Sequence, residues 1–202
     1  MGLAILITGL ALFIGVHAFA TFRAARAALI ARWGEGPYKL AFSLLAVLSL
    51  VLIVYGFGLY RSTGWIDIWY PPRWTRHVAV LLMWPAVVLL LAAYLPGHIK
   101  STVKHPMLVS VKLWAAAHLI ANGDLGSIVL FGTLLAWAVY DRIAVKRRER
   151  MEGMAASPVA IGAPAPRGWR NDAVALAVGT LVYLALGFTF HPILIGVPAF
   201  TG

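Results

Sequence analysis

The stretch "LAFSLLAVLSLVLIVYGFGLY" occupies residues 40–60 and contains no charged residue. As an α-helix rising about 1.5 Å per residue, it is long enough to cross the roughly 30 Å hydrocarbon core of a bilayer. A second uncharged run occupies residues 3–22, and we interpret it as a retained span because no positive residue precedes its apolar core. The chain is therefore expected to cross a membrane more than once.

The composition of the whole chain supports this interpretation. Of its 202 residues, 61% are hydrophobic and only 12% are charged, whereas soluble domains carry about 25% charged residues. The connection Asn122-Gly123-Asp124 is so short that the two segments beside it predict a central helical hairpin. We expect an all-α, polytopic transmembrane bundle of about six helices that forms a single domain over residues 1–202. The apolar segments that predict these helices are residues 3–22, 40–60, 78–95, 107–121, 125–140 and 173–190.

The net charge of +10 is explained by membrane topology. Most Lys and Arg residues lie in the first, third and fifth connections between the apolar segments, and few lie in the others. Positive residues concentrate in cytoplasmic loops, so both termini are expected on the opposite, periplasmic side. The expected partner is therefore the lipid bilayer and no nucleic acid is expected, while the oligomeric state stays open.

The fifth connection is the longest. It begins "DRIAVKRRERMEG" at residues 141–153, which predicts a helical extension of the fifth segment. It continues with a run rich in Ala, Pro and Gly, a composition typical of linkers. We expect a mobile cytoplasmic loop at about residues 146–168.

The chain contains no cysteine, which excludes disulfides, thiolate catalysis and covalent haem attachment through C-x-x-C-H. It also lacks the G-x-S-x-G, H-E-x-x-H and phosphate-loop motifs of common soluble enzymes. The remaining candidates for chemistry are ionisable residues inside the apolar segments, which are costly to bury and therefore point to function.

Two histidines lie within apolar segments, His17 in the first and His118 in the fourth. Each could simply bond to a backbone carbonyl, and the alanines around His118 could equally form a helix interface. Two imidazoles from different helices in a chain without cysteine suggest instead a b-type haem with His17 and His118 as iron ligands. Other candidates for contact with the cofactor are Trp114, which shares a helix face with His118, and Lys104 and Lys112, which could meet the haem propionates.

His105 cannot share one centre with His118 if residues 105–121 form a single helix. Thirteen residues at about 100° each place the two side chains on different faces and roughly 20 Å apart along the axis. Pro106 suits a first helical turn, so His105 is expected at the cytoplasmic interface. It could contact the cofactor directly, bind a propionate or a lipid headgroup, or be solvated.

Two further residues mark helix ends in the sequence. Asp124 is expected to cap the fifth apolar segment, since an aspartate side chain accepts hydrogen bonds from the first amides of a helix. Pro192, directly after His191, is expected to end the last helix.

The stretch "KHPMLVSVKLWAAAHLIANGDLGSIVLFG" at residues 104–132, together with His17 and the late Phe190-His191-Pro192, resembles the signature of the NnrU family. These are bacterial integral membrane proteins associated with denitrification genes, and the domain is similar to plant cis-ζ-carotene isomerase, which depends on a b-type haem. The resemblance implies haem ligation by His17 and His118 and a location in the bacterial inner membrane.

One position departs from the plant enzyme, because Ala115 stands where that enzyme has a cysteine three residues before the second histidine. A Cys/His ligand exchange is therefore not available to this chain. Three functions stay open. They are a haem b protein that supports nitrogen-oxide metabolism by redox chemistry or sensing, a haem-dependent cis-trans isomerase of an apolar polyene such as ζ-carotene, and a haem-free membrane scaffold. Whether the protein is an enzyme is left undecided.

Overall fold

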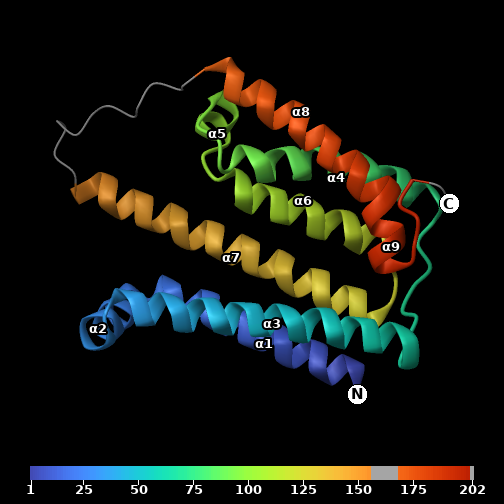
Figure 1. Ribbon diagram of the computed structural model, residues 1–202, viewed down its shortest axis with the longest axis horizontal. Coiled ribbons are helices and arrows are strands. Elements are labelled where there is room, and N and C mark those ends of the chain that lie inside the picture. Colours follow the sequence, from blue (N-terminus) through green and yellow to red (C-terminus); the bar gives the residue numbers. More distant parts are fainter. Residues whose placement is uncertain (156–167, 201–202) are drawn as a thin grey trace. The chain divides into compact units, whose positions relative to one another are not determined.

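The computed structural model describes residues 1–155 and 168–200, which are helical apart from short connections (Figure 1). By contacts the chain divides into two compact units. The first unit comprises Met1–Tyr70 and Asn122–Thr133, and the second comprises Pro71–Ala121 and Leu134–Gly202. The helical elements are α1 (Gly2–Thr21), α2 (Arg23–Trp33), α3 (Glu35–Thr63), α4 (Trp74–Ala92), α5 (His98–Val103), α6 (Pro106–Ala121), α7 (Leu125–Ala155), α8 (Trp169–Ala185), the π-helical η1 (Leu186–Phe190) and α9 (His191–Ile195).

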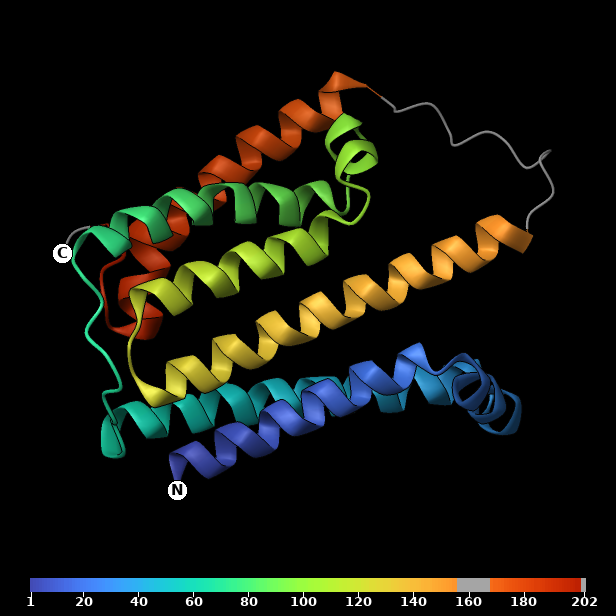
Figure 2. The ribbon, with the colours of Figure 1, turned by 180° about the vertical axis from the view of Figure 1, so that it is seen from behind.

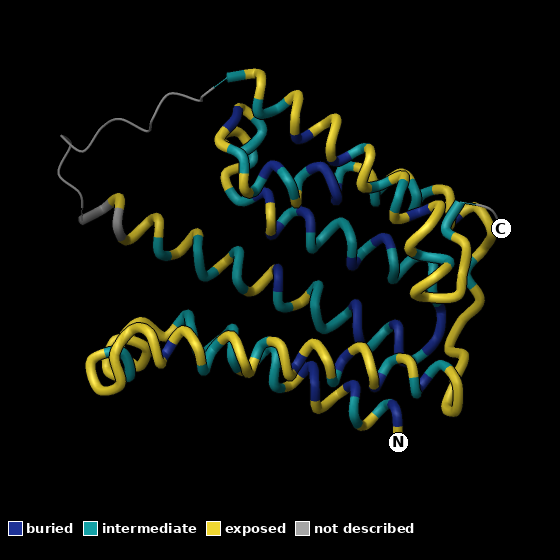
Figure 3. The backbone as a smooth tube through the Cα atoms, viewed as in Figure 1, coloured by how far each residue is buried: buried dark blue, intermediate teal, exposed yellow. Residues whose placement is uncertain are grey.

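Among the residues that the structure describes, five helical stretches are long and apolar enough to cross a membrane: Gly2–Thr21, Glu35–Thr63, Trp74–Ala92, Leu125–Met151 and Trp169–Ile195. The helix α6 is apolar but shorter, with 16 residues. Much of the apolar surface of α3 is exposed along its length, as expected for a helix that faces lipid (Figure 3). The prediction of an all-helical, polytopic membrane protein is confirmed.

In the first unit, α1 and α3 form a tight antiparallel pair (Figure 2). At Gly56 of α3 even a methyl group would collide with the backbone of Leu6, whose side chain is fully buried. Glycines let two membrane helices approach until their backbones touch, which is how such helices gain packing energy in lipid. Since residues three and four apart share a helix face, Phe13 and His17 lie on the same face of α1 as Leu6.

The loop after α3 pairs with the turn before α7. The amides of Ile68 and Trp69 donate to the Gly123 carbonyl at 2.9 and 3.1 Å, and the Leu125 amide donates to the Ile66 carbonyl at 2.9 Å. These bonds give backbone groups of both connections a hydrogen-bond partner within the protein.

Asp124 lies directly before α7 and caps its first turn, as predicted from the sequence. Its Oδ1 accepts a hydrogen bond from the Ser127 amide at 2.9 Å, and its side chain is buried. The expected helix cap is therefore confirmed.

In the second unit, α6 and α8 both pack against α4. The Ser110 hydroxyl of α6 donates to the Ala86 carbonyl of α4 at 2.6 Å. From the other side, the Tyr183 hydroxyl of α8 donates to the Val80 carbonyl at 2.9 Å, and Gly179 allows close backbone approach. The Ser110 bond holds α6, the helix that carries His118, against α4.

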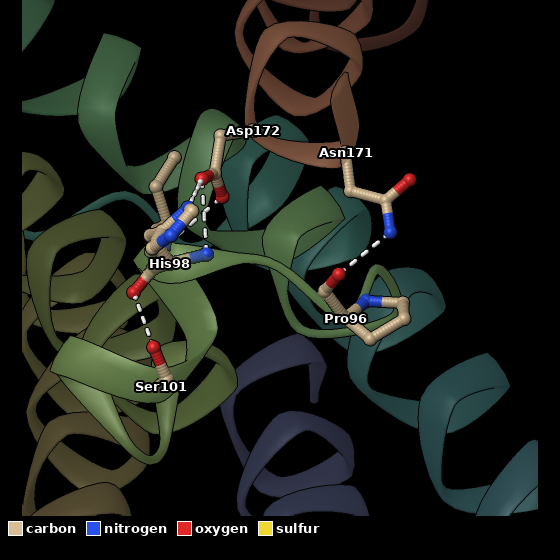
Figure 4. Close-up of polar contacts among 6 residues, drawn as sticks. Pro96, His98, Ser101, Asn171 and Asp172 are labelled. Atoms are coloured by element: carbon tan, nitrogen blue, oxygen red, sulfur yellow. Dashed lines mark hydrogen bonds and ion pairs between the residues drawn. The ribbon is translucent and has the colours of Figure 1, made fainter. Parts of the chain in front are cut away.

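A carboxylate clamp joins the start of α8 to α5 (Figure 4). Asp172 accepts hydrogen bonds from the amides of His98 and Ile99 at 2.9 and 3.0 Å, and from His98 Nδ1 at 3.0 Å. Beside it, the Asn171 side chain donates to the Pro96 carbonyl at 2.6 Å. His98 is thus engaged in holding two helices together.

Helices α2 and α5 were not predicted. Residues 23–33 are mostly Ala and Arg, which favour helix, but they form no apolar run long enough to mark a span. The expected extension of the fifth segment is confirmed, since α7 continues to Ala155. The loop expected at about residues 146–168 thus overlaps this helix up to residue 155, and residues 156–167 lie outside the described part.

The expectation that Pro192 ends the last helix is wrong. Helical structure continues to Ile195 because the chain widens into the π-helical turn η1 immediately before His191. Proline lacks the amide that an α-helix would use at this point, and a wider turn accommodates the missing bond.

We expect Gly56→Leu to lower the free energy of unfolding by about 1–3 kcal/mol, because the added side chain forces α1 and α3 apart. A lower thermal unfolding temperature of the detergent-solubilised protein measures this loss. The matched control is Gly58→Leu, since a Cβ at Gly58 meets nothing within 4 Å. Equal unfolding temperatures for the two variants would contradict the close approach at Gly56.

We expect Asp172→Ala to speed hydrogen exchange at the amides of His98 and Ile99, because both lose their acceptor. Hydrogen–deuterium exchange with mass spectrometry of the peptide covering α5 measures this. The control Asn171→Ala removes the bond to the Pro96 carbonyl but keeps the Asp172 carboxylate, and it should leave these two amides protected. Unchanged exchange in Asp172→Ala would show that the clamp does not form.

Candidate functional site

The imidazoles of His17 and His118 are held in the same way. His17 Nδ1 lies 2.8 Å from the Phe13 carbonyl, and His118 Nδ1 lies 2.8 Å from the Trp114 carbonyl, in each case four residues earlier on the same helix. A carbonyl only accepts hydrogen bonds, so each Nδ1 carries the proton and, in the neutral ring, the lone pair lies on Nε2. This is how proteins usually orient a histidine that binds metal.

His17 is half-buried between two aromatic rings of the first unit. The Phe13 ring stacks on the imidazole with centroids 4.0 Å apart, and the Phe42 ring of α3 meets it edge-on at 5.4 Å. The tight pairing of α1 with α3 brings Phe42 to this position. The ring plane of His17 is therefore set by packing as well as by its hydrogen bond.

His118 is half-buried on α6 in the second unit. The Trp114 ring lies 5.3 Å from the imidazole, so the predicted grouping of Trp114 with His118 is present in the structure. Ala115 and Ala117 of the same helix are fully buried, so these small residues lie in a packed part of the protein.

The two lysines predicted to meet a cofactor lie at different distances along α6 from His118. Lys112 is half-buried and precedes His118 by a helical rise of roughly 9 Å. Lys104 lies before the helix begins, more than about 18 Å along the axis from His118, and has a left-handed backbone with φ of 62°. Only Lys112 is near His118 along the chain.

His105 lies at the same end of α6 as Lys104 and contacts α7. Its Nε2 donates to Glu149 Oε1 at 2.6 Å, and Glu149 Oε2 lies 3.7 Å from Arg142 Nη1. Helix α6 begins at Pro106, as predicted, with His105 just before it. His105 links the start of α6 to α7 through this bond, and its contact with a cofactor stays a prediction.

His191, like His17 and His118, has its Nδ1 bonded to a backbone carbonyl. This bond was not predicted from the sequence. His191 Nδ1 lies 2.5 Å from the Val197 carbonyl, so this ring too has its lone pair on Nε2 when neutral. The sequence drew attention to His191 only through the late Phe190-His191-Pro192. That motif does not indicate that the chain turns back after α9 and supplies the Val197 carbonyl.

Within residues 1–155 and 168–200, no group of three or more His, Cys, Asp or Glu side chains is arranged to hold a metal ion. Zinc sites in proteins commonly have three or four protein ligands. Haem differs, because the porphyrin supplies four nitrogens and the protein adds only axial ligands. The donor set of neutral imidazoles with Nδ1 bound to carbonyls fits that requirement.

Comparison with known proteins agrees with the resemblance in the sequence. No curated protein and no solved structure matches the chain significantly. The family model described as "NnrU protein" matches residues 5–199, which includes His17, His118 and His191. The chain is therefore a member of the NnrU family.

Proposed function

We propose that this protein binds one haem b in the membrane through Nε2 of His17 and Nε2 of His118, and that it acts in nitrogen-oxide metabolism by redox chemistry or sensing. The observation that carries the proposal is the matching pair of Nδ1–carbonyl bonds, each 2.8 Å long. A chain without cysteine has no covalent C-x-x-C-H attachment, which excludes a c-type haem and is compatible with the b type that we propose.

The residues around each histidine prepare it to bind iron. The hydrogen bond from Nδ1 fixes the tautomer, restricts rotation of the ring and strengthens Nε2 as an electron donor. Around His17, Phe13 and Phe42 add apolar surface that excludes water. When bound through both histidines, haem would supply a one-electron couple. Lys112 is the side chain we propose for a propionate.

We further propose that the protein resides in the bacterial inner membrane with both termini in the periplasm. The support is the placement of Lys and Arg in alternate connections of a chain with several apolar helices. In this orientation α2, with Arg23, Arg26 and Arg32, lies at the cytoplasmic end of the α1/α3 pair.

Ala115 favours the redox or sensing function over polyene isomerisation. Residue 115 carries a methyl group and the chain has no cysteine, so no thiol is available beside His118 for exchange with a histidine ligand. Incubation of the dithionite-reduced protein with cis-ζ-carotene separates the two. We expect the cis substrate to remain unchanged, and accumulation of the trans product would establish the isomerase instead.

We expect the purified protein to show a Soret band with a low-spin spectrum that sharpens on reduction with dithionite. His17→Ala and His118→Ala should each weaken haem retention by about tenfold or more, because each removes an axial nitrogen. Absorption spectroscopy with a pyridine haemochrome assay measures both the spectrum and the haem content.

The control is His77→Ala, which removes an exposed histidine at the start of α4 and should retain the spectrum. A colourless preparation that is well folded, and stays colourless after incubation with haemin, would reject haem binding and favour a scaffold.

A further inference from the structure

The hydroxyl of Tyr38 is buried without a hydrogen-bond partner. Tyr38 lies one turn after the start of α3, and only 8% of its surface is exposed. Within residues 1–155 and 168–200, its Oη forms no hydrogen bond. A buried polar group without a partner is costly, so such groups are rare in native proteins and call for an explanation. This hydroxyl is suited to a group from outside the chain.

A positive charge lies against the same ring. The Arg26 guanidinium of α2 is 5.8 Å from the centroid of the Tyr38 ring, which is a cation–π contact. The Phe42 ring lies 6.4 Å from the Tyr38 ring by centroids. A guanidinium only donates hydrogen bonds and a phenol hydroxyl can donate one, so an oxyanion accepts from both.

These residues lie at one end of two membrane-spanning helices. Helix α2 connects α1 to α3, contacts both, and lies at the end of the α1/α3 pair (Figure 1). Since α1 and α3 are each long enough to cross the hydrocarbon core, this end lies at the membrane surface. Phe22 and Trp33, at the two ends of α2, are exposed, and aromatic side chains favour that depth.

The charge around the site suits an anion. Residues 22–39 contain four basic side chains and a single acidic one, Glu35. The Glu35 carboxylate is paired with Lys39, with Oε1 and Nζ 2.8 Å apart. The three arginines of α2 therefore give this surface a net positive charge, which attracts anionic lipid.

We propose that Tyr38 and Arg26 bind the headgroup of an anionic phospholipid. The Tyr38 hydroxyl donates to one phosphate oxygen, and the Arg26 guanidinium pairs with another. Arg26 is exposed and its side chain is flexible, so it can turn from the ring toward the phosphate and admit an oxygen to Oη. The site lies within the first unit and needs no haem.

The test measures how added lipid changes the thermal unfolding temperature of the full-length protein in detergent. A ligand that binds only the folded state raises this temperature by mass action. Phosphatidylglycerol is the anionic probe and phosphatidylcholine the zwitterionic one. Tyr38→Phe removes the hydroxyl and keeps the ring. The matched control is Tyr55→Phe, which removes the hydroxyl of an exposed tyrosine on the same helix.

We expect phosphatidylglycerol to raise the unfolding temperature of the wild type and of Tyr55→Phe more than phosphatidylcholine does. Tyr38→Phe should lose most of this difference. Without lipid, Tyr38→Phe should unfold at a temperature no lower than the wild type, because the hydroxyl makes no bond within the chain.

A second pair of variants tests the positive charge. Arg26→Gln should reduce the response to phosphatidylglycerol more than Arg32→Gln does. The two changes remove the same charge from the same helix, but only Arg26 lies over the Tyr38 ring.

Three results would overturn the proposal. Equal responses of Tyr38→Phe and Tyr55→Phe would leave the hydroxyl to water, and equal effects of the two lipids would exclude recognition of the anionic headgroup. Loss of haemin uptake by Tyr38→Phe, with its lipid response intact, would assign the hydroxyl to a cofactor carboxylate instead. None of these results bears on His17 or His118 as iron ligands.

Discussion

Backbone amides and carbonyls in hydrocarbon have no water to bond, and this constraint governs the whole protein. It explains why the described residues form helices almost throughout, and why the exceptions are paired elsewhere. The loop that contains Ile68 bonds to Gly123, and the segment that turns back after α9 offers the Val197 carbonyl to His191.

The same constraint acts on the imidazoles. A histidine in a membrane helix must place its N–H on an acceptor, and the carbonyl four residues earlier lies within reach. His17 and His118 both use that carbonyl, and His191 uses that of Val197. Satisfying Nδ1 leaves the lone pair on Nε2, so the requirement for hydrogen bonding also produces a metal-ligating tautomer. His98 and His105 differ because each bonds to a carboxylate.

Much of the fold was predictable because apolar length is a strong signal in membrane proteins. The predicted apolar segments correspond to α1, α3, α4, α6, α7 and the stretch from α8 to η1. The Asp124 cap was predictable from residue type and position alone. The helix α2 was not, because alanine and arginine favour helix without showing where a surface helix must form. The prediction that Pro192 ends the last helix was wrong because the local sequence does not indicate a π-helical turn.

By itself, the sequence determined the membrane class, the number and approximate limits of the apolar helices, and the choice of His17 and His118 as candidates. These properties depend on local composition and spacing. Tertiary structure alone decided that His105 meets Glu149 and that His191 receives a carbonyl from Val197. Contacts of this kind depend on segments that only packing brings together, and a single stretch of residues carries no record of them.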